Sequence, residues 1–121
     1  MAWPAVEIAK RYLEALHAED YDTAYALLAP DVEVVSPRRK TTGADALRAR
    51  WRKAEYSHLS SEIDEREFEQ RNGLIRATTR MTWRWKESGA VAYHTRVEGD
   101  FTIRDGRIER IETSVEHEAA A

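Results

Sequence analysis

Four aromatic side chains are the residues of this sequence best suited to hold a small organic molecule. They are Trp51, Trp83, Trp85 and Tyr93. Indole and phenol rings combine a large apolar area with one hydrogen-bonding group each. Two interpretations stay open: the rings pack as a core, or they line a pocket for a flat apolar ligand.

Small polar residues also interrupt apolar strand faces, at Ser36, Thr79, Thr95 and Thr113. Hydroxyl groups in such positions commonly bond to neighbouring backbone or to water. The alternative is that these hydroxyls are the polar contacts deep in a pocket.

His58 and Glu112 are the candidates for acid–base chemistry. A lone histidine is usually structural or solvent-facing, and catalysis is the alternative. Glu112 points inward only if a bulge after Gly106 shifts the phase of the last strand; otherwise Thr113 does. No second histidine or carboxylate lies at metal-ligand spacing, so the sequence predicts no metal site and no cofactor.

The composition excludes several function classes. The chain has 121 residues, no cysteine and a formal net charge of −3. Thiol and disulfide chemistry are therefore absent, and a nucleic-acid partner is not expected. No apolar run approaches the ~20 residues of a membrane span, and no signal peptide is visible, so we expect no membrane partner and a cytoplasmic protein. The length favours a single domain over 1–121, with its core at about 5–116.

Three helices are predicted to precede most of the strands. Apolar residues at three- and four-residue spacing indicate a helix over 4–17. Asp20 or Asp22 can cap a short second helix. Thr42 is the expected cap of a third.

The remaining chain alternates between apolar and polar residues, which predicts strands. A first strand covers 31–36, and four strands follow from about residue 58. Turn signals separate them at Asn72-Gly73, Glu87-Ser88-Gly89 and Asp105-Gly106.

The register of the middle hairpin can be tested by arithmetic. A three-residue turn with Gly89 in the left-handed conformation sets residues of like polarity opposite each other. The expected pairs are Trp85–Val91, Trp83–Tyr93, Met81–Thr95, Arg76–Asp100 and Thr78–Glu98.

The sequence resembles the nuclear transport factor 2-like superfamily, specifically its SnoaL-like branch. The matching segments read AKRYLEALHAEDYDTAYALLAPDVEVVSP, TTGADALRARW and VEGDFTIRDGRIERIE. The resemblance implies an α+β fold, cystatin-like, in which a cone-shaped curved antiparallel sheet carries the three N-terminal helices on its concave side. It also implies a pocket inside the cone and a homodimer through the outer sheet face.

The resemblance implies little about the reaction. In the ketosteroid isomerase-like members, a tyrosine of the first helix donates to an oxyanion, and Tyr12 matches it. The carboxylate base of those members corresponds to Ser36, and their late-strand acid falls near Gly99, so two of the three groups are missing. The Asp-Arg-Asp cluster of epoxide hydrolase-like members has no counterpart either. Tyr12 is therefore a packed core tyrosine or a ligand and oxyanion contact.

Three functions follow from these observations. The favoured one is binding of a small, largely apolar molecule, because the predicted interior is aromatic and nearly free of charge. The expected ligand contacts are Tyr12, Ser36, Trp51, Thr79, Trp83, Trp85, Tyr93, Thr95 and Thr113. The second is a SnoaL-like isomerase, cyclase or hydrolase that uses Tyr12 with His58 or Glu112, and the third is a protein-interaction or assembly domain. The basic segment 38–40 is a solvated loop, or it attracts an acidic ligand at the pocket rim.

Overall fold

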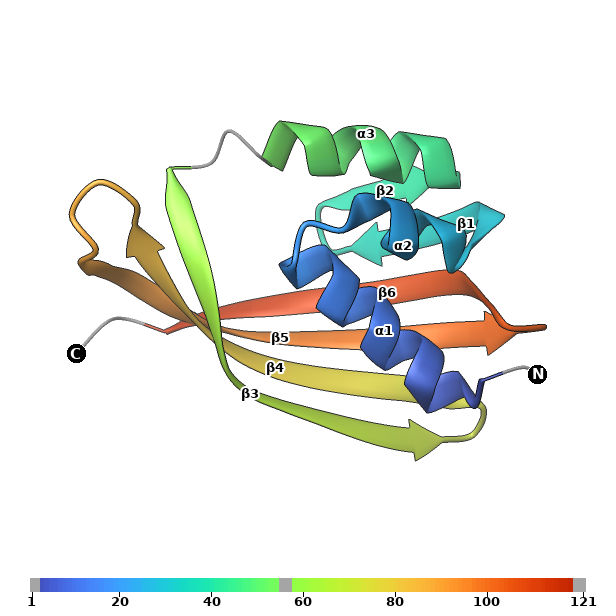
Figure 1. Ribbon diagram of the computed structural model, residues 1–121. Coiled ribbons are helices and arrows are strands. Elements are labelled where there is room, and N and C mark those ends of the chain that lie inside the picture. Colours follow the sequence, from blue (N-terminus) through green and yellow to red (C-terminus); the bar gives the residue numbers. More distant parts are fainter. Residues whose placement is uncertain (1–2, 55–57, 119–121) are drawn as a thin grey trace.

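The chain mixes helices and strands in its first half and then forms four long strands (Figure 1). The computed structural model describes residues 3–54 and 58–118, with backbone alone for 52–54. The elements are α1 (Ala5–His17), α2 (Tyr21–Ala26), β1 (Leu28–Ser36), β2 (Arg39–Thr42), α3 (Ala44–Ala54), β3 (Leu59–Arg71), β4 (Leu74–Trp85), β5 (Val91–Arg104) and β6 (Arg107–Glu118).

The strands form one sheet in the order β2-β1-β6-β5-β4-β3. The helices lie on one side of it, with α1 across the strands and α3 beside β1 (Figure 1). This is the α+β arrangement of three helices on one face of the sheet that the sequence predicts. The sheet is mixed rather than wholly antiparallel, because β1 runs parallel to β6. The predicted basic loop includes a short strand, β2, which pairs antiparallel with β1.

Local signals explain where several elements begin and turn. Asp20 accepts hydrogen bonds from the backbone N–H of Thr23 at 3.4 Å and from its hydroxyl at 2.7 Å, and so caps α2. Thr42 does not cap α3 as expected, because it ends β2 and the helix begins one residue later, after Gly43. Asn72 and Gly73 both have positive φ, as a two-residue type I′ hairpin requires.

The register of β4 and β5 is largely as predicted. Trp83 lies opposite Tyr93, and the three pairs at 81–95, 78–98 and 76–100 are confirmed. Gly89 is left-handed, with φ of 75°. The expected Trp85–Val91 pair is wrong, because a bulge after Trp83 brings Val91 opposite Arg84.

A second bulge lies in β6, directly after the turn at 105–106. Ile108 pairs with Ile103 and Arg110 with Thr102, so Glu109 is an extra residue without a partner in the ladder. The Glu109 carboxylate accepts from Arg104 Nε at 2.8 Å. An unbulged ladder would have put Glu112 opposite Gly99.

The core lies between α1, α3 and the sheet. Its most buried large side chains are Ile8, Val32, Ile75, Phe101 and Ile108. Among the described residues, no helix is both long and apolar enough to cross a membrane.

Candidate binding cavity

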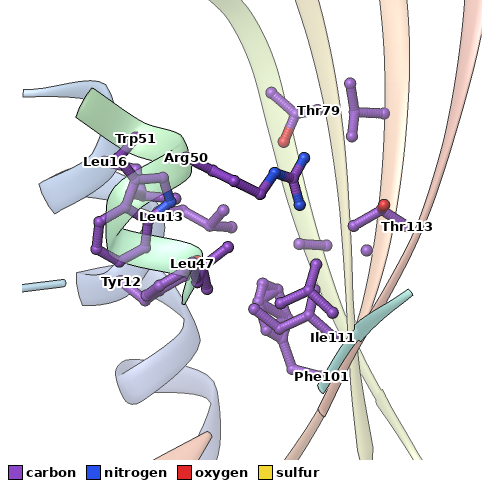
Figure 2. A pocket seen from close by; sticks show the side chains of 14 residues that line it. Tyr12, Leu13, Leu16, Leu47, Arg50, Trp51, Thr79, Phe101, Ile111 and Thr113 are labelled. Atoms are coloured by element: carbon purple, nitrogen blue, oxygen red, sulfur yellow. The ribbon is translucent and has the colours of Figure 1, made fainter. Parts of the chain in front are cut away.

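A cavity of about 330 Å³ separates the helices from the strands (Figure 2). Side chains of α1 and α3 form one wall, and those of β1, β4, β5 and β6 form the other. The lining residues are Tyr12, Leu13, Leu16, Val34, Leu47, Arg50, Trp51, Ala77, Thr79, Val97, Gly99, Phe101, Ile111 and Thr113. Most of these are aliphatic or aromatic, so the cavity offers an apolar environment.

Aromatic rings support the helical wall. The ring of Tyr12 meets that of Phe101 edge-on, with centroids 5.9 Å apart, and that of Trp51 at 6.2 Å. Trp51 in turn stacks on Tyr21 at 5.6 Å. These contacts connect α1, α2, α3 and β5, so the wall is fixed by packing from several elements.

Burial keeps the hydroxyl of Tyr12 protonated. The side chain is 3 % exposed. Desolvation raises its pKa well above the ordinary value of 10.0, and the positive charge of Arg50 offsets only part of this rise. Tyr12 is therefore a hydrogen-bond donor to the cavity at any physiological pH.

Two small residues on the strand wall make room for the cavity. Ala77 of β4 pairs with Gly99 of β5, and both are buried. A Cβ atom added at Gly99 would lie 3.5 Å from the ring of Phe101. The space opposite Tyr12 therefore depends on small side chains at positions 77 and 99.

Arg50 is the one charged side chain of the described cavity lining. It leaves α3 and its guanidinium points between Thr79 and Thr113 (Figure 2). Its Nη1 donates to the hydroxyl of Thr41 at 2.8 Å. Burial lowers the pKa of Arg50, and the nearby charge of Arg39 lowers it further.

Arg50 corrects the expectation of a nearly uncharged interior. The apolar stripe of the helix alone does not predict a charged side chain in the cavity. The usable signal was spacing: Arg50 follows Leu47 by three residues and precedes Trp51, and both of these are buried. A long side chain at the edge of such a stripe can extend its charged end along the buried face.

Four of the predicted contacts lie in the cavity lining: Tyr12, Trp51, Thr79 and Thr113. The hydroxyl of Thr113 is 3.5 Å from the carbonyl oxygen of Val35, and that of Thr79 accepts from Arg66 Nε at 2.9 Å. The last strand thus presents Thr113 to the cavity and Glu112 to the opposite face. The predicted bulge exists, but its effect is the reverse of the one required to turn Glu112 inward.

Four other predicted contacts lie outside the cavity, farther along β4 and β5 toward their connecting turn: Trp83, Trp85, Tyr93 and Thr95. Trp83 donates from Nε1 to the hydroxyl of Thr95 at 2.9 Å, and its ring is 6.1 Å from that of Tyr93. Trp85 is 48 % exposed. The hairpin of β4 and β5 extends beyond the helices at this end (Figure 1).

Ser36, His58 and Glu112 also lie outside the cavity. Ser36 donates to the carbonyl oxygen of Arg39 at 3.3 Å and borders a groove on the outer sheet face, where exposed Glu112 also lies. His58 is exposed beside Trp85 at the far end of the sheet. The structure therefore does not bring His58 or Glu112 beside Tyr12.

The described lining sets what the cavity can do chemically. It contains no carboxylate and no imidazole, the groups that commonly remove a proton from carbon. Nor do the histidine and acidic side chains that the structure describes form a group of three suited to a metal ion. The cavity can bury an apolar body and donate hydrogen bonds to it.

A family model described as the SnoaL-like domain matches residues 9–111. Among solved structures, a nuclear transport factor 2-like protein from Burkholderia xenovorans is 21% identical. The match covers 92% of this chain and 88% of that one, with a TM-score of 0.76. A candidate polyketide cyclase from Xanthomonas campestris is 20% identical over 91% and 88% of the two chains, with a TM-score of 0.78.

An epoxide hydrolase of LEH-like type from Mycobacterium tuberculosis also shares the fold. It is 18% identical over 93% of this chain and 82% of that one, with a TM-score of 0.73. No protein with a curated description matches the sequence. At these identities the solved structures establish the fold alone.

Proposed function

The chain belongs to the SnoaL-like domain family, and from this premise we propose that it binds a small, largely apolar molecule in the cavity between its helices and sheet. One observation carries the proposal: the cavity is walled by aliphatic and aromatic side chains, and its described lining holds no acid or imidazole. Ligand sites of proteins are commonly concave and mostly apolar, with a few polar groups that fix orientation.

The size of the cavity limits the ligand. Its volume of about 330 Å³ is near the lower end of the range for small-molecule sites. A body of one or two rings suits this space. The ring of Tyr12 and the small residues Ala77 and Gly99 on the strand wall favour a planar shape.

Binding is favoured over proton abstraction because the described lining lacks a base. Tyr12 and Arg50 can each donate a hydrogen bond to an oxygen atom of a ligand, but neither accepts a proton near neutral pH. The polyketide cyclase and epoxide hydrolase names among the fold relatives refer to organic small molecules, which supports a ligand of that kind.

Titration with a neutral two-ring probe, 1-naphthamide, tests the proposal. We expect binding with one probe per chain by calorimetry, and shifts of the amide resonances of α1 and β5 by NMR. Ala77→Leu adds bulk to a residue of the cavity lining and should weaken binding at least about tenfold. The control Thr78→Val lies on the other face of the same strand and should bind the probe as the wild type does.

Two results would overturn the proposal. One is the absence of binding to the wild-type chain. The other is unchanged binding to a folded Ala77→Leu variant. If Ala77→Leu fails to fold, Gly99→Ala replaces it, because the added Cβ makes only ordinary contacts with Phe101.

A further inference from the structure

The guanidinium of Arg50 enters the cavity without an acidic partner. None of the ion pairs among the described side chains includes it. Its one hydrogen bond to a described residue joins Nη1 to Thr41, although the group carries five N–H donors. Partial burial of a cation is favourable only where an anion or water accepts hydrogen bonds from its remaining N–H groups.

A second arginine adds to the positive charge beside the cavity. Arg66 of β3 donates from Nε to the hydroxyl of Thr79, which lines the cavity. Arg66 is half-buried and forms none of the ion pairs found among the described residues. Burial lowers its pKa, and the charge of Glu14 offsets part of this change.

The basic segment 38–40, which precedes α3, adds to the positive electrostatic potential near the cavity. Arg39 lies close enough to Arg50 for its charge to lower the pKa of that side chain. Arg39 itself is exposed, so it can attract an anion from solvent toward the cavity.

Two further side chains of the cavity lining, Tyr12 and Trp51, carry hydrogen-bond donors. Tyr12 stays protonated because it is buried, and its hydroxyl forms no hydrogen bond with another described residue. The indole of Trp51 carries a donor and no acceptor. A cavity rich in donors and without a described carboxylate complements a ligand that offers acceptors and negative charge.

We propose that the cavity selects an apolar carboxylic acid, whose carboxylate binds the guanidinium of Arg50 while its ring lies between Tyr12 and the strand wall. This inference deepens the proposed function and rests on it. A planar guanidinium matches a planar carboxylate through two parallel hydrogen bonds. Arg50 is the one cation of the described lining, and its planar donor pair fits one carboxylate group.

A matched pair of probes tests this inference. 1-Naphthoate and 1-naphthamide share one ring system and differ in the charge of the group attached to it. We expect the wild-type chain to bind the naphthoate at least about tenfold more tightly than the amide. Arg50→Met keeps a long side chain but removes the charge, and it should abolish this preference while the amide still binds.

Two further variants separate the bidentate contact from charge alone. Arg50→Lys keeps the charge without the planar donor pair and should retain only part of the preference. Arg107→Met removes an exposed arginine at the β5–β6 turn, away from the cavity, and should leave both affinities unchanged. The Nε–H resonance of Arg50 should move farther on addition of naphthoate than on addition of the amide.

The outcomes distinguish carboxylate selection from the proposed binding of an apolar molecule. Equal affinity of the wild-type chain for the two probes would overturn the carboxylate assignment and leave apolar binding intact. An undiminished preference in Arg50→Met would also overturn it. Failure of both probes to bind the wild-type chain would remove the proposed function and this inference together.

Discussion

Replacement of Tyr12 by phenylalanine should change how the stability of the protein depends on alkaline pH. Tyr12 is 3 % exposed, and burial raises its pKa above the ordinary value of 10.0. In the unfolded chain the same phenol loses its proton near pH 10. Between these two pKa values the folded chain binds one proton more than the unfolded chain does.

The sign and size of the effect follow from this difference. The contribution of protonated Tyr12 to the free energy of unfolding is fully present below pH 10. It decreases as the pH rises toward the pKa of the folded state. The free energy of unfolding should fall by about 1.4 kcal/mol for each pH unit above 10 because of this one group. Between pH 10 and about pH 11.5 the loss approaches ~2 kcal/mol.

Urea unfolding of the wild type and Tyr12→Phe over about pH 8 to 11.5 measures this effect. Near neutral pH we expect the two stabilities to agree within about 1 kcal/mol, because the hydroxyl has no described hydrogen-bond partner. Above pH 10 the wild type should lose stability faster, until the variant is favoured by ~2 kcal/mol. Groups common to both chains cancel in the comparison.

Ultraviolet titration of tyrosinate provides an independent readout. In the folded wild-type chain Tyr12 should remain protonated at a pH at which the same residue ionises in urea. Parallel stability curves for the two proteins above pH 10 would show that the Tyr12 phenol is hydrated in the folded state. The proposed donor role of Tyr12 would then lose its basis.

Phe101→Ala should cost about 3–5 kcal/mol of unfolding free energy, because the ring is 2 % exposed and supports Tyr12; a loss below about 1 kcal/mol in urea unfolding would contradict this packing. Gly106→Ala should cost about 1–2 kcal/mol, because residue 106 has φ of 76°; no loss in the same assay would mean that the turn adopts another form. A double-mutant cycle on Arg76 and Asp100, joined at 2.9 and 3.2 Å, should give a coupling of about 0.2–1 kcal/mol that shrinks in salt. A coupling that does not respond to salt would be inconsistent with an exposed pair. We also propose a homodimer through the outer sheet face, where the buried Nε of Arg96 has no described partner; light scattering should then give twice 14.0 kDa, and a monomer at high concentration would refute it.

Local patterns were enough to predict most of the fold. Helical spacing and an Asp20 cap define α1 and α2, and Asn72-Gly73 fixes a tight hairpin. Face alternation was also enough to set the pairing of Trp83 with Tyr93. The parallel contact of β1 with β6 was missed, because it joins segments far apart in the chain and leaves no local signal.

The site was harder to predict than the fold because it depends on how far the helices extend along the strands that they cover. Alternation shows which face of a strand is apolar but not how far the helices extend over it. Trp83 and Thr79 therefore look equivalent in the sequence, although only Thr79 lies in the cavity. Arg50 was missed for a different reason. Where the long side chain of an arginine places its guanidinium depends on the shape of the adjoining cavity, which the sequence does not show.

The extra residue in β6 has an evolutionary consequence. Glu109 takes up one position between the turn and the sheet, and so determines which neighbour, Glu112 or Thr113, shares the cavity with Arg50. If the extra residue moved to a point beyond position 113, the cavity would gain a carboxylate next to a guanidinium without a single substitution inside it. A cavity that binds acids and a cavity that contains a base can thus differ by no more than the position of one bulge in β6.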